Sequence, residues 1–214
     1  MNYTSPRGLI AGGEVIKEIK AAGSKAVLAQ ANVALLSDLE KLVEAALTLS
    51  ESEKIDIVIH NAATGDDCYM EDMTEEFYEA QTDVNLKGRV GSGHAGFMAD
   101  SLTAPIFLTQ LTLPHIARGG RIVLVSSVSA RMGMPQQTVY AGTKAALEGI
   151  AKVWAMELGK KYSITVNCVS PGPVATDMWT ECEPDVIAGF QPIINSTPAA
   201  ARVGEISDIV PVVS

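Results

Sequence analysis

Three short runs rich in isoleucine and valine constrain the fold of this chain more than any other feature. They cover residues 55–59, 122–125 and 164–169, and apolar side chains predominate in each. A predominantly apolar run is typical of a strand that is buried on both faces, as strands of parallel sheets are. The three runs therefore predict buried parallel strands.

Helical patterns separate these runs. Apolar residues recur at helical spacing in residues 9–22, 37–49, 74–85 and 106–117, Ser37 is suited to cap the second of these helices, and residues 25–30 suit a further strand. Strands that alternate with helices are typical of the α/β class, in which helices cover both faces of a parallel sheet. With 214 residues and 47% hydrophobic content, the chain is long enough for one full core. We expect a single doubly wound α/β domain over residues 1–214.

Charge and cysteine content exclude several classes of protein. A net charge of −9 provides no basic surface for nucleic acid or an anionic membrane, and no run of about 18 apolar residues is present to span one. The three cysteines are an odd number without metal-ligand spacing, so neither a disulfide framework nor a metal site is indicated. The N-terminus has no signal-peptide pattern. We expect a cytoplasmic protein that binds neither nucleic acid nor membrane.

Small polar residues follow the predicted strands at four places. They are Asn32, residues 61–63, the pair Ser126-Ser127 and residues 171–176. Ligands of open α/β sheets bind at the carboxyl ends of the strands, so clusters at those ends are expected to converge on one site. Any one cluster alone would be an ordinary strand-to-helix turn.

Tyr140 and Lys144 are the candidate chemical centre. They are four residues apart at the start of a helical pattern and therefore share one helix face. An ammonium group beside a phenol favours the phenolate and lowers a pKa that begins near 10, which makes tyrosine a usable general acid. Ser127, thirteen residues earlier at the end of a strand, can place a second hydroxyl at the same substrate oxygen.

Residues 119–150, with Ser127, Tyr140 and Lys144, resemble the catalytic segment of the short-chain dehydrogenase/reductase family, and most closely its ketoreductases such as 3-oxoacyl-[acyl-carrier-protein] reductases. The resemblance implies a Rossmann-like fold and hydride transfer between a nicotinamide cofactor and a carbonyl or alcohol substrate. It implies that Tyr140 exchanges the proton, Ser127 hydrogen-bonds the carbonyl oxygen, and Lys144 lowers the pKa of Tyr140 and holds the nicotinamide ribose. Asn85, in a segment similar to the family's V-N-x-x-G, would relay protons.

The same resemblance implies a set of cofactor-binding residues. Asn61-Ala62-Ala63 stands where the family has N-A-G, with His60 before it expected to be a capping or solvent-exposed residue. Asn32-Val33 stands where the family usually has Asp-Val against adenine. Asn2-Tyr3-Thr4-Ser5 resembles the end of the family's second strand, and the absence of an acidic residue there favours NADP(H) over NAD(H). Homo-dimers or homo-tetramers are common in the family. The full expected cofactor set is Asn32, Val33, Asn61, Ala62, Ala63, Tyr140, Lys144, Pro171, Gly172, Val174 and Thr176.

The chain also departs from the family pattern. The glycine-rich turn T-G-x-x-x-G-x-G is missing, and Gly8, Gly12 and Gly13 have the wrong spacing to replace it. We therefore expect the chain to be incomplete at both ends, without the first strand, the glycine-rich turn and the first helix. Residues 89–104 interrupt an otherwise continuous helical pattern, either as translated intron sequence or as a genuine loop.

Two functions remain open on the sequence. One is an NADP(H)-dependent oxidoreductase acting on a small carbonyl or alcohol compound, with Tyr140 as general acid and base. The other is a catalytically incomplete relative that serves as a binding or assembly subunit, which the missing phosphate turn favours. Residues 177–196 are apolar and would either shape the substrate site or pack as a lid helix on the core.

Overall fold

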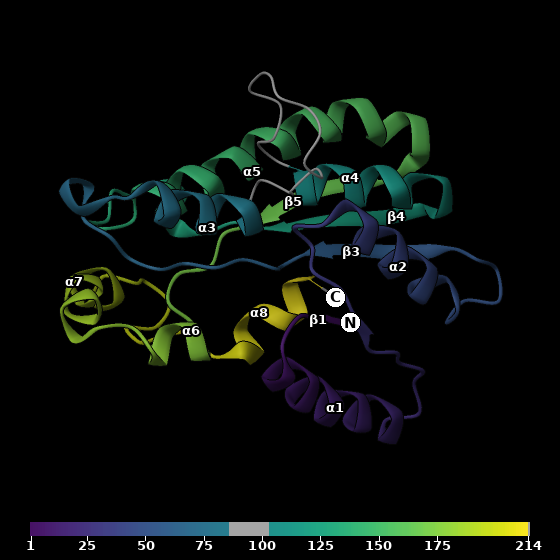
Figure 1. Cartoon of the computed structure of the whole chain (residues 1–214), viewed down its shortest axis with the longest axis horizontal. Coiled ribbons are helices and arrows are strands. Elements are labelled where there is room, and N and C mark those ends of the chain that lie inside the picture. The colour runs from purple at the N-terminus through teal and green to yellow at the C-terminus, as the bar shows by residue number, and fades with distance from the viewer. Residues whose placement is uncertain (86–102, 214) are drawn as a thin grey trace.

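The strands of this protein run parallel, as the sequence predicts. The structure, a computed structural model, describes residues 1–85 and 103–213 (Figure 1). Within these residues the strands form a two-stranded sheet of order β1–β2 and a three-stranded sheet of order β3–β4–β5, with every pair parallel. The strands are β1 (Asn2–Tyr3), β2 (Ala29–Gln30), β3 (Ile55–His60), β4 (Ile116–Val125) and β5 (Thr165–Val169).

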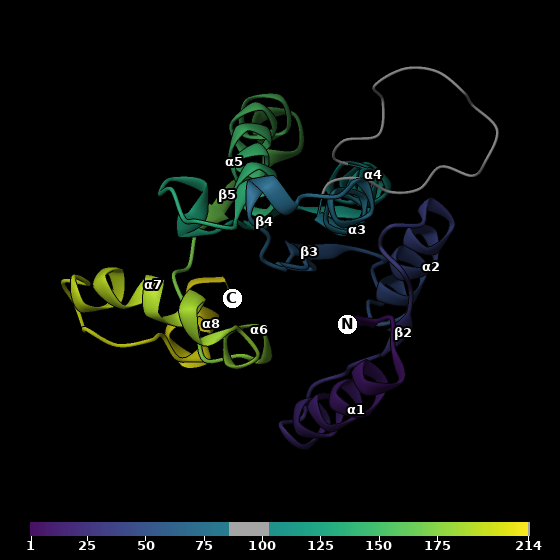
Figure 2. The ribbon, with the colours of Figure 1, turned by 60° about the vertical axis from the view of Figure 1, so that its left-hand side comes forward.

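Helices lie on both sides of the three-stranded sheet, which confirms the expected α/β class. Helices α3, α4 and α5 are on one side of it, and α1, α6, α7 and α8 are on the other in both views (Figures 1 and 2). The helices are α1 (Pro6–Ala21), α2 (Leu36–Leu47), α3 (Glu75–Asn85), α4 (Thr103–Thr112), α5 (Thr138–Leu158), α6 (Asp177–Thr180), α7 (Pro184–Asn195) and α8 (Ile206–Val213).

The main core lies between the three-stranded sheet and α5. Ile122 and Leu124 on β4 are fully buried, and they pack with Val166 on β5 and with Leu147 and Ala151 on α5. Burying one aliphatic side chain of this size contributes about 1.5–3 kcal/mol. This packing fixes the carboxyl ends of β4 and β5 relative to the start of α5.

The connection between α4 and β4 differs from the sequence prediction. The helix expected to reach residue 117 ends at Thr112, and Pro114 lies in a short 3-10 turn that follows. Proline has no amide hydrogen to continue a helical ladder, and its ring clashes with the preceding turn. The strand then begins at Ile116, six residues before the predicted start at residue 122.

Two glycines explain why the strand extends so far back. Gly119 has φ +84°, a conformation that other residues rarely adopt. A Cβ atom on Gly120 would lie 2.8 Å from the carbonyl oxygens of both Ala117 and Asp56, so only glycine fits between them. The pairing of β3 with β4 shifts register at this place. The Gly-Gly pair is therefore an irregularity inside β4 and does not bound it.

The start of α2 also corrects a prediction. The N-cap residue is Leu35 rather than Ser37, and its side chain makes no capping hydrogen bond. Instead the Asn32 amide N–H donates to Asp38 Oδ2 at 2.9 Å, and the Ala34 amide N–H donates to Asn32 Oδ1 at 3.0 Å. The turn before α2 is held by Asn32 and Asp38, and the strand predicted at residues 25–30 is reduced to its last two residues.

Some predictions concern absences or lie outside the described residues. Within residues 1–85 and 103–213, no helix is long and apolar enough to cross a membrane. No cluster of metal-ligating side chains occurs in the same ranges. The insertion predicted at residues 89–104 lies outside the described part of the chain except for Thr103 and Ala104, which begin α4.

His60 is half-buried, with its ring against α4 and α5, contrary to the expected capping or solvent-exposed position. Its Nε2 atom hydrogen-bonds with Thr109 Oγ1 on α4 at 2.9 Å, and its ring lies 6.3 Å from the Trp154 ring on α5. Burial lowers the pKa of His60 to about 4. The imidazole is therefore neutral at physiological pH and joins the end of β3 to the two helices above it.

The buried neutral ring predicts a pH-dependent loss of stability. In the unfolded chain His60 takes up a proton near pH 6.5, whereas in the folded chain it does so only near pH 4. The contribution of neutral His60 to the free energy of unfolding is therefore complete above pH 6.5. As the pH falls towards 4, at most about 3 kcal/mol of it is lost. We expect the free energy of unfolding, measured by urea denaturation, to fall less steeply over this range in His60→Asn. Parallel curves for the two proteins would contradict this assignment.

Candidate active site

The carboxyl ends of β3, β4 and β5 open into one cavity of about 900 Å³. Most of the residues predicted for catalysis and cofactor binding line it, so the convergence expected from the four polar clusters is observed for three of them. Asn32, Val33 and Asn85 are not among its lining residues. The predicted residues that line the cavity are Asn61, Ala62, Ala63, Ser127, Tyr140, Lys144, Pro171, Gly172, Val174 and Thr176.

Tyr140 and Ser127 form a hydroxyl pair in this cavity. Tyr140 lies in the first turn of α5, and Ser127 follows β4 as the N-cap of a short 3-10 turn, where its hydroxyl also accepts the Ser129 amide N–H at 3.2 Å. Burial raises the pKa of Tyr140, a hydrogen bond with Ser127 lowers it, and the charge of Asp67 raises it again. The net direction is upward, so Tyr140 carries its proton at neutral pH.

Lys144 corrects one expectation about Tyr140. Its ammonium nitrogen lies 5.6 Å from the centroid of the Tyr140 ring and donates to the Val125 carbonyl oxygen at 2.7 Å. Only 3% of the residue is exposed, and burial lowers the pKa of Lys144 to about 8. The predicted lowering of the Tyr140 pKa is therefore wrong for this structure, because the ammonium is directed at a backbone carbonyl and burial of the phenol dominates.

Asn85 holds the loop that follows β3. At the last residue of α3, its Oδ1 accepts the Thr64 amide N–H and its Nδ2 donates to the Thr64 carbonyl, both at 2.8 Å. Nδ2 also donates to Thr143 Oγ1 on α5 at 3.3 Å. The amide is thus fully engaged with the protein, and the contacts of Asn85 in this structure are those of a residue that positions the loop beside α5.

The loop after β5 is fixed to its neighbours by backbone hydrogen bonds. The Val128 amide N–H donates to the Pro171 carbonyl at 2.9 Å, which joins the ends of β4 and β5. Gly204 donates to the Pro173 carbonyl at 2.9 Å and accepts the Ala175 amide N–H at 2.8 Å. The predicted cofactor loop is therefore held in place on two sides.

The family departures at residues 32 and 63 have different outcomes. Ala63 is not among the non-glycine residues with positive φ, so alanine in place of the family glycine causes no backbone strain. Asn32 uses its side-chain oxygen in the turn before α2, and Val33 is buried in the packing between α2 and α4. The structure does not bring Asn32 and Val33 into the cavity with the other predicted residues.

Two residues of the site were missed by sequence reasoning. A Cβ atom on Gly65 would lie 3.1 Å from the Tyr140 ring, so glycine allows the loop after β3 to approach the tyrosine closely. Glu148, one helical turn after Lys144, accepts hydrogen bonds from Ser126, Ser170 and Arg131. It therefore joins α5 to the ends of β4 and β5. The i, i+4 spacing from Lys144 was the available signal for Glu148, and no local pattern marks Gly65.

The apolar segment at residues 177–196 serves both purposes that the sequence left open. Met178, Trp179, Cys182 and Phe190 line the cavity, and Phe190 also packs in a small core with Val186 and Ile194. A further wall was not foreseen. It comes from α8, through Ile206, Ile209, Val210 and Val213.

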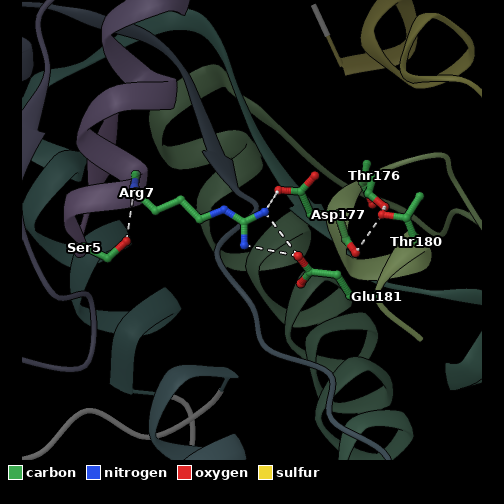
Figure 3. Close-up of polar contacts among 7 residues, drawn as sticks. Ser5, Arg7, Thr176, Asp177, Thr180 and Glu181 are labelled. Atoms are coloured by element: carbon green, nitrogen blue, oxygen red, sulfur yellow. Dashed lines mark hydrogen bonds and ion pairs between the residues drawn. The ribbon is translucent and has the colours of Figure 1, made fainter. Parts of the chain in front are cut away.

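An exposed ion-pair cluster connects α6 to α1 (Figure 3). Arg7, in the first turn of α1, donates to Asp177 Oδ2 at 2.9 Å and to Glu181 Oε1 at 3.1 Å, at the two ends of α6. Ser5 caps α1 by accepting the Gly8 amide N–H at 3.1 Å. The pairing joins the two segments that lie on the same side of the three-stranded sheet.

The residues present fit one end of a nicotinamide cofactor. Tyr140, Lys144 and the loop at residues 171–176 line a single large cavity, as the ribose and nicotinamide would require. Gly8, Gly12 and Gly13 all lie inside α1 and so form no phosphate-binding turn after a strand. Within the described residues, the donors for the diphosphate are therefore not assembled around a glycine-rich loop.

Comparison with known proteins gives the family. The family model described as short chain dehydrogenase matches residues 9–186. The chain therefore belongs to the short-chain dehydrogenase family, a class of NAD(P)-dependent oxidoreductases. Its fold, its parallel strands and the Ser127–Tyr140–Lys144 arrangement agree with that membership.

Individual relatives match over most of this chain but only part of their own length. The short-chain dehydrogenase/reductase FrzI of Cladobotryum sp is 39% identical over 203 residues, which cover 94% of this chain and 72% of FrzI. Tetrahydroxynaphthalene reductase PfmaG of Pestalotiopsis fici is 34% identical over 182 residues, covering 85% of this chain and 58% of that protein. A solved structure of a blue fluorescent protein from a metagenomic library, in complex with NADPH, has a TM-score of 0.80 at 26% identity and covers 99% of this chain and 76% of its own.

Proposed function

We propose that this chain catalyses hydride transfer between NADP(H) and a carbonyl or alcohol compound, with Tyr140 as the general acid and base. The observation that carries the proposal is the placement of Tyr140, with its hydroxyl at Ser127 and its ring beside Lys144, in a cavity at the carboxyl ends of the strands. The choice of NADP(H) is supported by the NADPH complex of a structural neighbour and by the reductase names of relatives.

Each residue has a distinct task in this proposal. The bound nicotinamide cofactor supplies or accepts the hydride. Tyr140 gives its proton to the carbonyl oxygen as the alcohol forms, and Ser127 donates a hydrogen bond to the same oxygen. Lys144 holds the ribose. Asn85 keeps the loop after β3 against α5.

Further parts of the proposal concern the whole protein. Residues 1–214 form one doubly wound domain, in which residues 89–104 are an insertion. Homo-dimers or homo-tetramers form through α5, where Val153 and Met156 are exposed side chains of an otherwise packed helix. The reducing cytoplasm is the proposed compartment, supported by three free cysteines.

Binding of NADPH tests the proposal against a catalytically incomplete relative. Trp179 lines the cavity, whereas Trp154 packs against the His60 ring and is not among the lining residues. Titration with NADPH should therefore quench mainly Trp179 emission, with a dissociation constant in the micromolar range that calorimetry reproduces. Trp179→Phe should lose most of the quenching and retain calorimetric binding. Absence of binding by both methods would favour a role as a binding or assembly subunit.

A further inference from the structure

Asp67 and Gln137 form a polar pair on the cavity wall that the proposed reaction does not use. Both residues line the cavity together with Tyr140. Gln137 Nε2 donates to Asp67 Oδ1 at 3.2 Å, while Gln137 Oε1 is buried and has no hydrogen-bond partner among the described residues. That oxygen is enclosed by the protein and does not open to the cavity, so the group that the pair presents to a ligand is the Asp67 carboxylate, held in place by Gln137 Nε2.

The pair is held rigidly on the wall. The Cys68 amide N–H donates to the Gln136 carbonyl at 2.9 Å, which forms a parallel bridge between the two segments. Gln81, which is only 1% exposed, donates to the Asp66 carbonyl at 2.6 Å from α3. Because both neighbours of Asp67 are fixed in this way, its carboxylate has a defined position relative to Tyr140.

The chemistry of the pair selects a donor. A carboxylate accepts hydrogen bonds, so the ligand of Asp67 must carry an N–H or O–H group. Burial raises the pKa of Asp67, the hydrogen bond from Gln137 lowers it, and Asp66 and Asp185 raise it further. A hydroxyl fits better than an ammonium group, because the Lys144 ammonium lines the same cavity and Met178 and Trp179 add apolar walls.

We infer that Asp67, positioned by Gln137, is a specificity-determining residue that binds a hydroxyl group of the substrate, away from the carbonyl that reacts at Tyr140. The inference rests on the proposed function and narrows its substrate to hydroxylated ketones with an apolar body. The carbonyl is held by Ser127 and Tyr140, the hydroxyl by Asp67, and the apolar part by the residues of α6 and α7. Two polar anchors fix the orientation of the carbonyl more firmly than one.

The test compares 1-tetralone with its 5-, 6- and 7-hydroxy derivatives. With NADPH, at least one hydroxylated isomer should have a kcat/KM about ten- to a hundredfold above that of 1-tetralone, as expected for a hydrogen bond to a charged acceptor. The ratio of kcat/KM for the hydroxylated isomer to kcat/KM for 1-tetralone should fall to about one in Asp67→Leu and decrease in Gln137→Met. Calorimetric dissociation constants for the same ketones provide a readout independent of turnover.

A matched control is available next to the pair. Asp66→Asn removes an equal charge from an exposed neighbour and should leave the ratio unchanged, and melting temperatures report whether each variant folds. An unchanged ratio in both Asp67→Leu and Gln137→Met would overturn the inference while leaving the proposed function intact. Tighter binding of an amino-substituted tetralone than of every hydroxylated isomer would also overturn it. Absence of NADPH oxidation with all of the ketones would overturn the proposed function, and the inference with it.

Discussion

Tyr140→Phe should lower kcat for ketone reduction by about a hundred- to ten-thousand-fold, the range for loss of a positioned general acid. Phenylalanine keeps the ring and its packing beside Gly65 and removes only the hydroxyl that faces Ser127. The fold should therefore survive, with a change in the free energy of unfolding of about 1 kcal/mol. Steady-state kinetics with NADPH and urea denaturation measure the two effects separately.

The control for this substitution is Tyr69→Phe, which removes the hydroxyl of a tyrosine that is 47% exposed. This variant should keep full activity. Retention of NADPH binding in Tyr140→Phe, measured by calorimetry, would locate the defect in proton transfer. Full turnover by Tyr140→Phe would contradict the proposed mechanism directly.

The raised pKa of Tyr140 also sets the direction of the pH profile. Reduction uses the protonated phenol, which the net effect of burial, Ser127 and Asp67 favours at neutral pH. Reduction should thus be insensitive to pH near neutrality and slow as the pH rises towards the pKa of the phenol. Oxidation of the alcohol uses the phenolate and should accelerate with pH. An oxidation rate that is constant between neutral and alkaline pH would exclude Tyr140 as the base.

Lys144→Met should reduce kcat/KM by about a hundredfold, through loss of a charge-assisted contact to the ribose. Stability should respond in the opposite direction. The folded-state pKa of about 8 lies below the ordinary 10.5, so burial of the ammonium costs the folded protein stability at pH 7, on the order of 3 kcal/mol. Lys144→Met removes this cost but also removes the hydrogen bond to the Val125 carbonyl, which offsets about 1–3 kcal/mol of the stability gained.

The sign of this effect can be followed with pH. Between pH 8 and 10.5 the unfolded chain binds the Lys144 proton and the folded chain releases it, so the wild type becomes more stable as pH rises. In urea denaturation, the free energy of unfolding of Lys144→Met relative to the wild type should be smaller at pH 10 than at pH 7. Lys152→Met, on an exposed face of the same helix, should change neither activity nor this slope. Full activity of Lys144→Met would contradict the proposed contact with the ribose and leave Lys144 only its hydrogen bond to the Val125 carbonyl.

Much of this site could be predicted because its signals are local. The strands at residues 55–59 and 164–169 are short apolar runs, and Tyr140 and Lys144 are related by one helical turn. The position of Ser127 at the end of β4 follows from the apolar run before it. In each case the information lies within a few residues of the feature itself.

The rest depends on contacts between distant parts of the chain. The pairing of Gln137 with Asp67 joins residues 70 positions apart, and no periodicity in either segment indicates it. The early start of β4 depends on the fit of Gly120 against Asp56 on the neighbouring strand. The pKa of Tyr140 could not be predicted from Lys144 alone, because burial and Asp67 act on it from other segments. Local patterns predicted which residues meet in the cavity, but not their surroundings.

The link from Arg7 to α6 makes one wall of the cavity sensitive to ionic strength. The side chains of Arg7, Asp177 and Glu181 are 72%, 77% and 62% exposed, so these ion pairs are weak and are screened by dissolved salt. The Lys144 contact with the Val125 carbonyl, by comparison, is shielded from ions by burial. A concentrated salt solution would therefore loosen the contact between α1 and α6 while Lys144 keeps its position, so that the outer wall and the buried end of the cavity respond to different properties of the solvent.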